Sequence, residues 1–261
     1  MFSNSLGTPM SNCCSSIIIR TNCEKNLMKN KKISLQPAFV LHTRLYRETS
    51  LLINVLTMEY GKISLVARGV RNKNSTQHTI LQPLIPLLIS YSGRTTLYTL
   101  QQVETNGPGY HLKEKMLLST LYLNELLIKL LPDEEPHDSI FIYYKNTLEK
   151  LTHTTNLAME LRLFEKQLLK ALGYGIELTK TILNETIEPQ KYYTYQFGYG
   201  FSNAPYNTSE CFAGSSLLAF ADEKLKTEDD MKNAKRLTRI ILTSLLNHRP
   251  LRSRELFYVP Q

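Results

Sequence analysis

The side chains best suited to chemistry in the first part of this chain are cations. Residues 33–105 hold seven arginines and lysines against three carboxylates, which gives a net charge of +4. Cations of this kind can neutralise nucleic-acid phosphates and release their counterions without any catalysis. The alternative is a solvated surface that happens to be basic, and charge alone does not decide between them. The candidates for DNA contacts are Arg44, Arg47, Lys62, Arg68, Arg71, Lys73 and Arg94.

A second set of cations lies near the end of the chain. Residues 231–261 carry a net charge of +6, whereas residues 106–230 carry −6. This basic segment could pair with the acidic middle of the chain, or it could bind DNA or an acidic protein tail. Its candidate residues are Lys235, Arg236, Arg239, Arg252 and Arg254, together with Lys232 and Arg249.

No arrangement of side chains in the sequence points to catalysis, a cofactor or a metal. Six histidines are scattered along the chain, and none has a second histidine four residues away, as zinc enzymes do. No Gly-x-x-x-x-Gly-Lys phosphate loop is present. The acidic residues at 133, 134, 135 and 138 could bind magnesium, but the flanking Pro132 and Pro136 favour an exposed loop. The sequence therefore predicts a binding protein rather than an enzyme.

The cysteines indicate a reducing compartment. Three of the four, Cys13, Cys14 and Cys23, fall near the N-terminus, Cys211 stands alone, and there is no Cys-x-x-Cys pair. Neither a zinc ribbon nor a disulfide framework fits this spacing. No apolar run approaches the ~18 residues needed to span a membrane. We therefore expect a cytoplasmic, nucleoid-associated protein.

The cations of the first part need a scaffold, and the apolar pattern predicts five strands. They are expected at 36–46, 49–58, 62–70, 81–93 and 95–104. Five strands in about 70 residues fit an oligonucleotide-binding (OB) barrel, which offers a basic groove to a nucleic acid. Several strands are apolar on both faces, so one face is expected to fill the barrel and the other to be covered by the next domain.

After Gly107-Pro108-Gly109 the period changes to that of helices. Helices are predicted at 111–131, 140–151, 157–173 and 229–247. The segment between the helices predicted at 157–173 and 229–247 is rich in tyrosine and phenylalanine. It is predicted to be a small irregular element whose rings form a minor core. The alternative is that the rings stack on nucleic-acid bases.

The expected domain organisation has three parts. Residues 1–32 are predicted to be a disordered N-terminal extension, with Met28 as a possible native start. Residues 33–107 form the barrel. Residues 108–261 form the helical domain, with the aromatic-rich element inserted at about 176–215.

Five strings in the sequence carry a specific resemblance. They are AFVLHTRLYRETSLLINVLTMEYGKISLVARGVR (38–71), LQPLIPLLISYSGR (81–94), LYLNELL (121–127), LRLFEKQLLKALGYG (161–175) and AKRLTRIILTSLLNHRPLRSRELF (234–257). In this order they resemble the RecO family of bacterial DNA repair proteins. The resemblance implies an α+β protein, with a five-stranded OB barrel followed by an α-helical domain that contains a small element of the zinc-finger type.

The resemblance also implies a function and partners. A protein of this family acts as a recombination mediator that binds single- and double-stranded DNA and anneals complementary strands. With RecR it helps to load RecA onto DNA coated by single-strand-binding protein (SSB), and RecF is a further indirect partner. Many relatives carry four cysteines in the inserted element. Only Cys211 falls there in this chain, so metal binding is not carried over, and aromatic packing is expected to replace the metal.

In the family, the acidic C-terminal tail of SSB docks on the helical domain, in an apolar pocket with basic residues. Arg162 matches the position expected to take part, whereas Leu161 and Phe164 are expected in the core. The alternative function is an adaptor that docks SSB and RecR, with DNA contact secondary.

Overall fold

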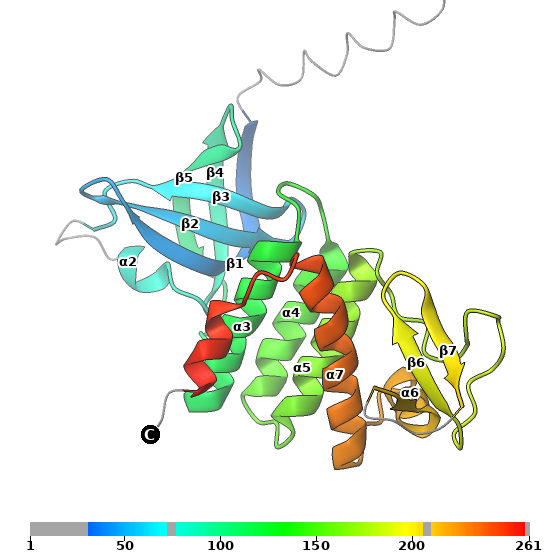
Figure 1. The fold of residues 1–261 in the computed structure, drawn as a ribbon. Helices are drawn as coiled ribbons and strands as arrows, with labels where there is room; N and C mark the ends of the chain where they lie inside the picture. The colour runs from blue at the N-terminus through cyan, green and yellow to red at the C-terminus, as the bar shows by residue number, and fades with distance from the viewer. Residues whose placement is uncertain (1–30, 72–76, 206–209, 259–261) are drawn as a thin grey trace, which may run out of the picture.

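The structure is a computed structural model that describes residues 31–71, 77–205 and 210–258 of the 261-residue chain. Figure 1 shows the barrel at one end of the molecule, a group of helices in the middle and a small sheet at the other end. The expected extension lies outside the described residues except for Lys31 and Lys32, which belong to the first strand.

The N-terminal part is a closed five-stranded barrel, as the sequence predicted. Its strands are β1 (Lys31–Tyr46), β2 (Ser50–Thr57), β3 (Gly61–Ala67), β4 (Pro86–Gly93) and β5 (Leu97–Thr105). They follow the order β1-β2-β3-β5-β4, and only the β3–β5 pair is parallel. Strand β4 begins five residues later than expected because the short helix α2 (Gln77–Ile80) and a turn precede it.

The two apolar faces of the strands go to two different cores. Val40, Ile53 and Leu65 point into the barrel and are fully buried there. Phe39, Leu41 and Leu56, on the same strands, pack instead with residues of the helices. This arrangement confirms the expectation that the helical domain covers one face of the barrel wall, and it follows from the alternation of side chains along a strand.

The helical part contains α3 (Glu114–Leu130), α4 (Asp138–Leu151), α5 (Leu157–Ala171) and α7 (Glu228–Leu245). Helix α7 begins with a capping box in which Thr227 and Asp230 each accept from the other's backbone N–H. A 3₁₀ segment, η2 (Arg252–Tyr258), returns along α3 (Figure 1). Among the described residues, no helix combines the length and apolarity needed to cross a membrane.

The inserted element is a three-stranded sheet with a short helix. Strands β6 (Tyr192–Gln196), β7 (Gly200–Ala204) and β8 (Phe212–Ala213) pair in the order β7-β6-β8, and α6 (Gly214–Ala221) follows. Tyr193, Phe201 and Phe212 are buried, and the last two rings meet edge-on at 6.0 Å. Within the described ranges, no three His, Cys, Asp or Glu side chains come close enough to hold a metal ion. The buried rings of Tyr193, Phe201 and Phe212 form the core of this element.

Polar contacts join the barrel to the helices. The Lys62 ammonium donates to the Ile128 carbonyl at 2.7 Å and pairs with Asp133 at 3.2 Å. The Tyr98 hydroxyl donates to Glu134 at 2.7 Å. The expected acidic loop at 133–135 is thus seated on the barrel, although Asp133 and Glu135 remain exposed.

A second contact is fully buried. The Asn124 side chain donates to the Leu41 carbonyl at 3.0 Å and accepts from the Tyr144 hydroxyl at 2.6 Å. Hydrogen bonds that satisfy buried polar groups fix relative orientation. The barrel and the helices consequently form one unit.

Candidate nucleic-acid interface and anion pocket

Four of the predicted DNA-binding arginines lie at one end of the barrel. Arg44 is near the end of β1, Arg47 is in the β1–β2 turn, and Arg68 and Arg71 follow β3. All four are exposed. The register pairs Leu51 with both Leu45 and Ala67, so these segments end side by side. The barrel therefore presents an arginine cluster, defined here as Arg44, Arg47, Arg68 and Arg71.

Arg71 also has a structural task in this cluster. Its guanidinium donates to the carbonyls of Arg47 and Glu48, at 3.3 and 2.8 Å, and its backbone N–H donates to Thr49. These bonds hold the β1–β2 turn, where Arg47 has a positive φ of 51°. Arg47 in turn lies over the Tyr46 ring at 5.3 Å. Arg44 and Arg68 are therefore better positions for testing charge alone.

The other barrel candidates lie elsewhere. Arg94 is in the β4–β5 turn, beside Gly93, which pairs with Lys31 at the opposite end of β1 from Arg44. The Lys31 ammonium lies 4.4 Å from the centre of the Tyr60 ring and 5.7 Å from that of Tyr98. Lys31 is therefore a cationic neighbour of Arg94, although the sequence pattern assigned Lys31 to the disordered extension.

Lys62 does not lie on the exposed surface of the barrel. Its side chain is buried against α3, where it meets the Ile128 carbonyl and Asp133. A polyanion could reach it only if the barrel and the helices separated, so the sequence-based assignment of Lys62 is corrected. Lys73 lies outside the described residues.

The helical domain contains a cation-lined pocket of about 630 Å³ between α3, α5, α7 and η2. Its apolar wall is formed by Tyr122, Leu157, Leu161 and Met231. Five cations surround this wall, and we call the site the anion pocket. They are Arg162, Lys232, Lys235, Arg239 and Arg254.

The floor of the anion pocket is a buried polar network. Glu165, which is fully buried, accepts from the Tyr122 hydroxyl and from the Arg162 guanidinium, both at 2.6 Å. Arg254 lies over the Tyr122 ring at 5.7 Å. Burial, reinforced by the Glu165 carboxylate, raises the pKa of Tyr122. The phenol therefore stays protonated and donates to Glu165.

Two buried atoms of this network are left over. Arg162 Nε and Glu165 Oε2 have no hydrogen-bond partner among the described residues, although both side chains line the pocket. Buried polar atoms without partners are uncommon in folded proteins. They show that the hydrogen bonds of this network leave two of its buried atoms unsatisfied.

The anion pocket gathers five of the eight cations predicted for the C-terminal basic segment or the SSB-tail site: Arg162, Lys232, Lys235, Arg239 and Arg254. Arg236 points away, donating to the Cys211 carbonyl and lying 4.0 Å from the Phe212 ring centre, so it fastens α7 to the inserted element. Arg252 is exposed but does not line the pocket.

The apolar wall was the part that sequence reasoning missed. Phe164 is in the core as expected, but Leu161 lines the pocket instead. The sequence of α7 held a signal for this pocket, because Met231, Lys235 and Thr238 share one face of the helix at helical spacing. Spacing of this kind looks like ordinary core packing until the neighbouring helices are known.

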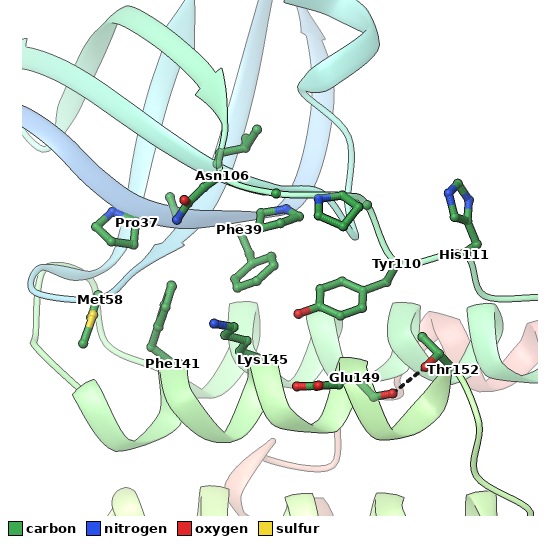
Figure 2. Close-up of a pocket in the computed structure, with 16 residues that line it drawn as sticks. Pro37, Phe39, Met58, Asn106, Tyr110, His111, Phe141, Lys145, Glu149 and Thr152 are labelled. Atoms are coloured by element: carbon green, nitrogen blue, oxygen red, sulfur yellow. Dashed lines mark hydrogen bonds between the residues drawn. The ribbon is translucent and has the colours of Figure 1, made fainter.

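A second cavity, of about 720 Å³, lies between the barrel and α4. Figure 2 shows Phe39, Tyr110 and Phe141 around it, with the Tyr110 hydroxyl directed toward α4 near Lys145 and Glu149. Burial and the Glu149 carboxylate raise the pKa of Tyr110. The opposite charges of Lys145 and Glu149 give this cavity no preference for a polyanion.

A barrel of the OB type with exposed arginines, joined to a helical domain with a cation-lined pocket, defines an OB-fold protein with two separate basic surfaces. Two family models match it: "Recombination protein O N terminal" over residues 28–108 and "Recombination protein O C terminal" over residues 115–255. The chain belongs to the RecO family and has a role in recombinational DNA repair.

Curated relatives agree with this assignment. The chain is 41% identical over 230 residues to DNA repair protein RecO of Coxiella burnetii (strain RSA 493 / Nine Mile phase I), covering 87% of this chain and 99% of the relative. It is 44% identical over 221 residues to that of Pseudoalteromonas atlantica, with 84% and 92% covered. The RecO of Methylococcus capsulatus is 40% identical over 227 residues, with 87% and 93% covered.

Proposed function

We propose that this protein is a non-enzymatic recombination mediator. In this proposal it binds single- and double-stranded DNA, anneals complementary strands and, with RecR, helps to load RecA onto SSB-coated DNA, with RecF as an indirect partner. The observation that carries the proposal is the combination of an arginine cluster on the barrel with a separate anion pocket on the helices. Two such surfaces on one chain would allow DNA and the protein that coats it to be bound together.

The arginine cluster supports backbone contacts rather than sequence reading. Its four guanidinium groups come from a strand end and two turns, and none of them lies on a helix that could enter a major groove. Contacts to phosphates position a protein on DNA but carry no sequence information. The proposed DNA binding is therefore independent of sequence and sensitive to salt.

Replacing Arg44 and Arg68 together by glutamate should weaken DNA binding to the same degree for unrelated sequences. The slope of log K against log salt is negative, and each lost phosphate contact reduces its magnitude by about 1. The measurement is a salt titration of the affinity for single- and double-stranded oligonucleotides. The control is Lys180→Glu with Lys224→Glu, which makes the same charge change at exposed residues of the helical part. An unchanged slope in the Arg44/Arg68 variant would remove the arginine cluster from the DNA-binding surface.

The anion pocket supports docking of the SSB tail. An acidic peptide with an apolar C-terminal residue needs cations around an apolar cavity, and the pocket supplies both. Its volume lies within the range of ordinary ligand pockets. Glu228 also lines the pocket, but Lys232 pairs with it at 3.0 Å, so the rim stays cationic.

The alternative is an adaptor that docks SSB and RecR, with DNA contact secondary. The burial of Lys62 favours it, because the barrel offers fewer cations than the sequence suggested. An adaptor would bind the SSB tail through the anion pocket but would not accelerate annealing of bare strands. The two functions therefore differ on uncoated DNA.

A further inference from the structure

The last part of the described chain forms one wall of the anion pocket. After α7 the backbone reverses at Asn247 and His248, which have positive φ values of 49° and 59°, and η2 runs back along α3 (Figure 1). Leu251 and Ser253 are buried there. The segment contributes a single described residue, Arg254, to the pocket lining. The position of this cation thus depends on how the segment is held.

One carboxylate, that of Glu125 on α3, holds the segment. Its Oε1 accepts from the Arg252 N–H at 3.0 Å, and its Oε2 accepts from the N–H and the hydroxyl of Ser253 at 2.8 and 2.6 Å. Lys129 pairs with Glu125 at 2.8 Å and also donates to the Pro250 carbonyl at 2.9 Å. Two α3 side chains therefore bind three positions around the start of η2.

The surroundings of the Glu125 carboxylate favour its ionised form. Burial by itself would raise the pKa of Glu125, but the hydrogen bonds from Lys129 and from the segment outweigh it and lower the pKa to about 2. Glu125 is consequently ionised at neutral pH. Hydrogen bonds to a charged group are also stronger than neutral ones, so the contact is suited to fixing a chain segment.

Glu125 does not line the anion pocket, and its charge has the wrong sign to attract an anion. Through Coulomb interaction alone, removing this charge would strengthen the binding of an acidic ligand. If its task is to hold Arg254 in place, removing it would weaken that binding. The two effects have opposite signs, so an experiment can separate them.

We propose that Glu125 is a positioning residue of the anion pocket, which clamps the C-terminal segment so that Arg254 completes the ring of cations around an acidic peptide. The inference rests on the proposed function, since it takes the pocket's occupant to be an acidic protein tail. The inference adds that peptide binding depends on Glu125, although Glu125 does not touch the peptide.

A double-mutant cycle tests the proposal. Binding of a fluorescent peptide with the acidic SSB tail is measured for the wild type, Glu125→Ala, Arg254→Ala and the double variant. Glu125→Ala should weaken binding about tenfold, which corresponds to ~1.4 kcal/mol. In the Arg254→Ala background the same change should have less than about a twofold effect, because the cation it positions is gone.

Controls separate positioning from general damage to the fold. Glu177→Ala removes a carboxylate that accepts from the N–H and hydroxyl of Thr179 and does not line the pocket, so peptide affinity should not change. Glu125→Gln keeps an acceptor oxygen and should fall between the wild type and Glu125→Ala. Amide hydrogen exchange should accelerate at residues 252–254 in Glu125→Ala, with the rest of α3 and α7 unaffected.

The outcomes distinguish this inference from the proposed function. If the wild type binds the peptide and Glu125→Ala binds it equally well or more tightly, the inference fails while the pocket assignment stands. An equal loss in the wild-type and Arg254→Ala backgrounds would also overturn it. A wild type that does not bind the peptide would overturn the pocket assignment and the inference together.

Discussion

Reversing two charges on the rim of the anion pocket, Lys235→Glu with Arg239→Glu, is expected to weaken binding of the SSB tail about a hundredfold, or ~2.8 kcal/mol. Both side chains are exposed and make no hydrogen bond or ion pair within the described part of the chain, so the fold does not depend on them. Each reversal removes an attraction and adds a repulsion next to an acidic ligand. Duplex DNA affinity should change little if the arginine cluster carries it.

The measurement is peptide binding by fluorescence anisotropy, with DNA binding measured in parallel. The matched control is Lys180→Glu with Lys224→Glu, which has the same net charge and leaves the pocket intact. Peptide affinity equal to that of the wild type would move the docking site away from the pocket. Arg162 is a poorer choice for this test, because its reversal would bury a second carboxylate beside Glu165 and disturb the fold.

The second large effect concerns the junction between the barrel and the helices. Gly61 has a φ of +64°, and a Cβ at this position would lie 1.8 Å from the Glu135 carbonyl oxygen. Gly61→Ala should therefore displace the loop at 133–135 and strain the contacts of Lys62 and Tyr98 with it. The expected loss in the free energy of unfolding is about 4 kcal/mol, measured by chemical denaturation.

Gly198→Ala is the matched control for this substitution. Gly198 also has a positive φ, of +81°, but a Cβ added there would have no heavy atom within 4 Å. It should cost only the backbone term of about 1 kcal/mol. Equal destabilisation by the two substitutions would contradict the close approach of the barrel and the acidic loop.

The barrel and the main helices could be predicted from the sequence because their signals are local. Alternating apolar residues placed the five strands, and Gly107-Pro108-Gly109 marked the change to helical period. Helix α6 was missed because it has only eight residues and follows an irregular stretch. Helix α2, with four residues, was missed for the same reason.

The candidate site was less predictable because it depends on contacts distant in sequence. In the sequence, Lys62 cannot be told apart from the other barrel cations. In the structure it is buried where it donates to the Ile128 carbonyl, 66 residues further along the chain. The anion pocket draws on four separate elements. Sequence patterns identified several of its cations but not Tyr122 or Met231, which give the pocket its apolar wall.

The most direct test of the proposed mediator function is annealing of complementary oligonucleotides, bare and coated with SSB, without ATP. We expect the wild type to accelerate annealing on both substrates. The Lys235→Glu/Arg239→Glu variant should accelerate it only on bare DNA, and the Arg44→Glu/Arg68→Glu variant should be impaired on both. Failure of the wild type to accelerate annealing on either substrate would contradict the mediator function.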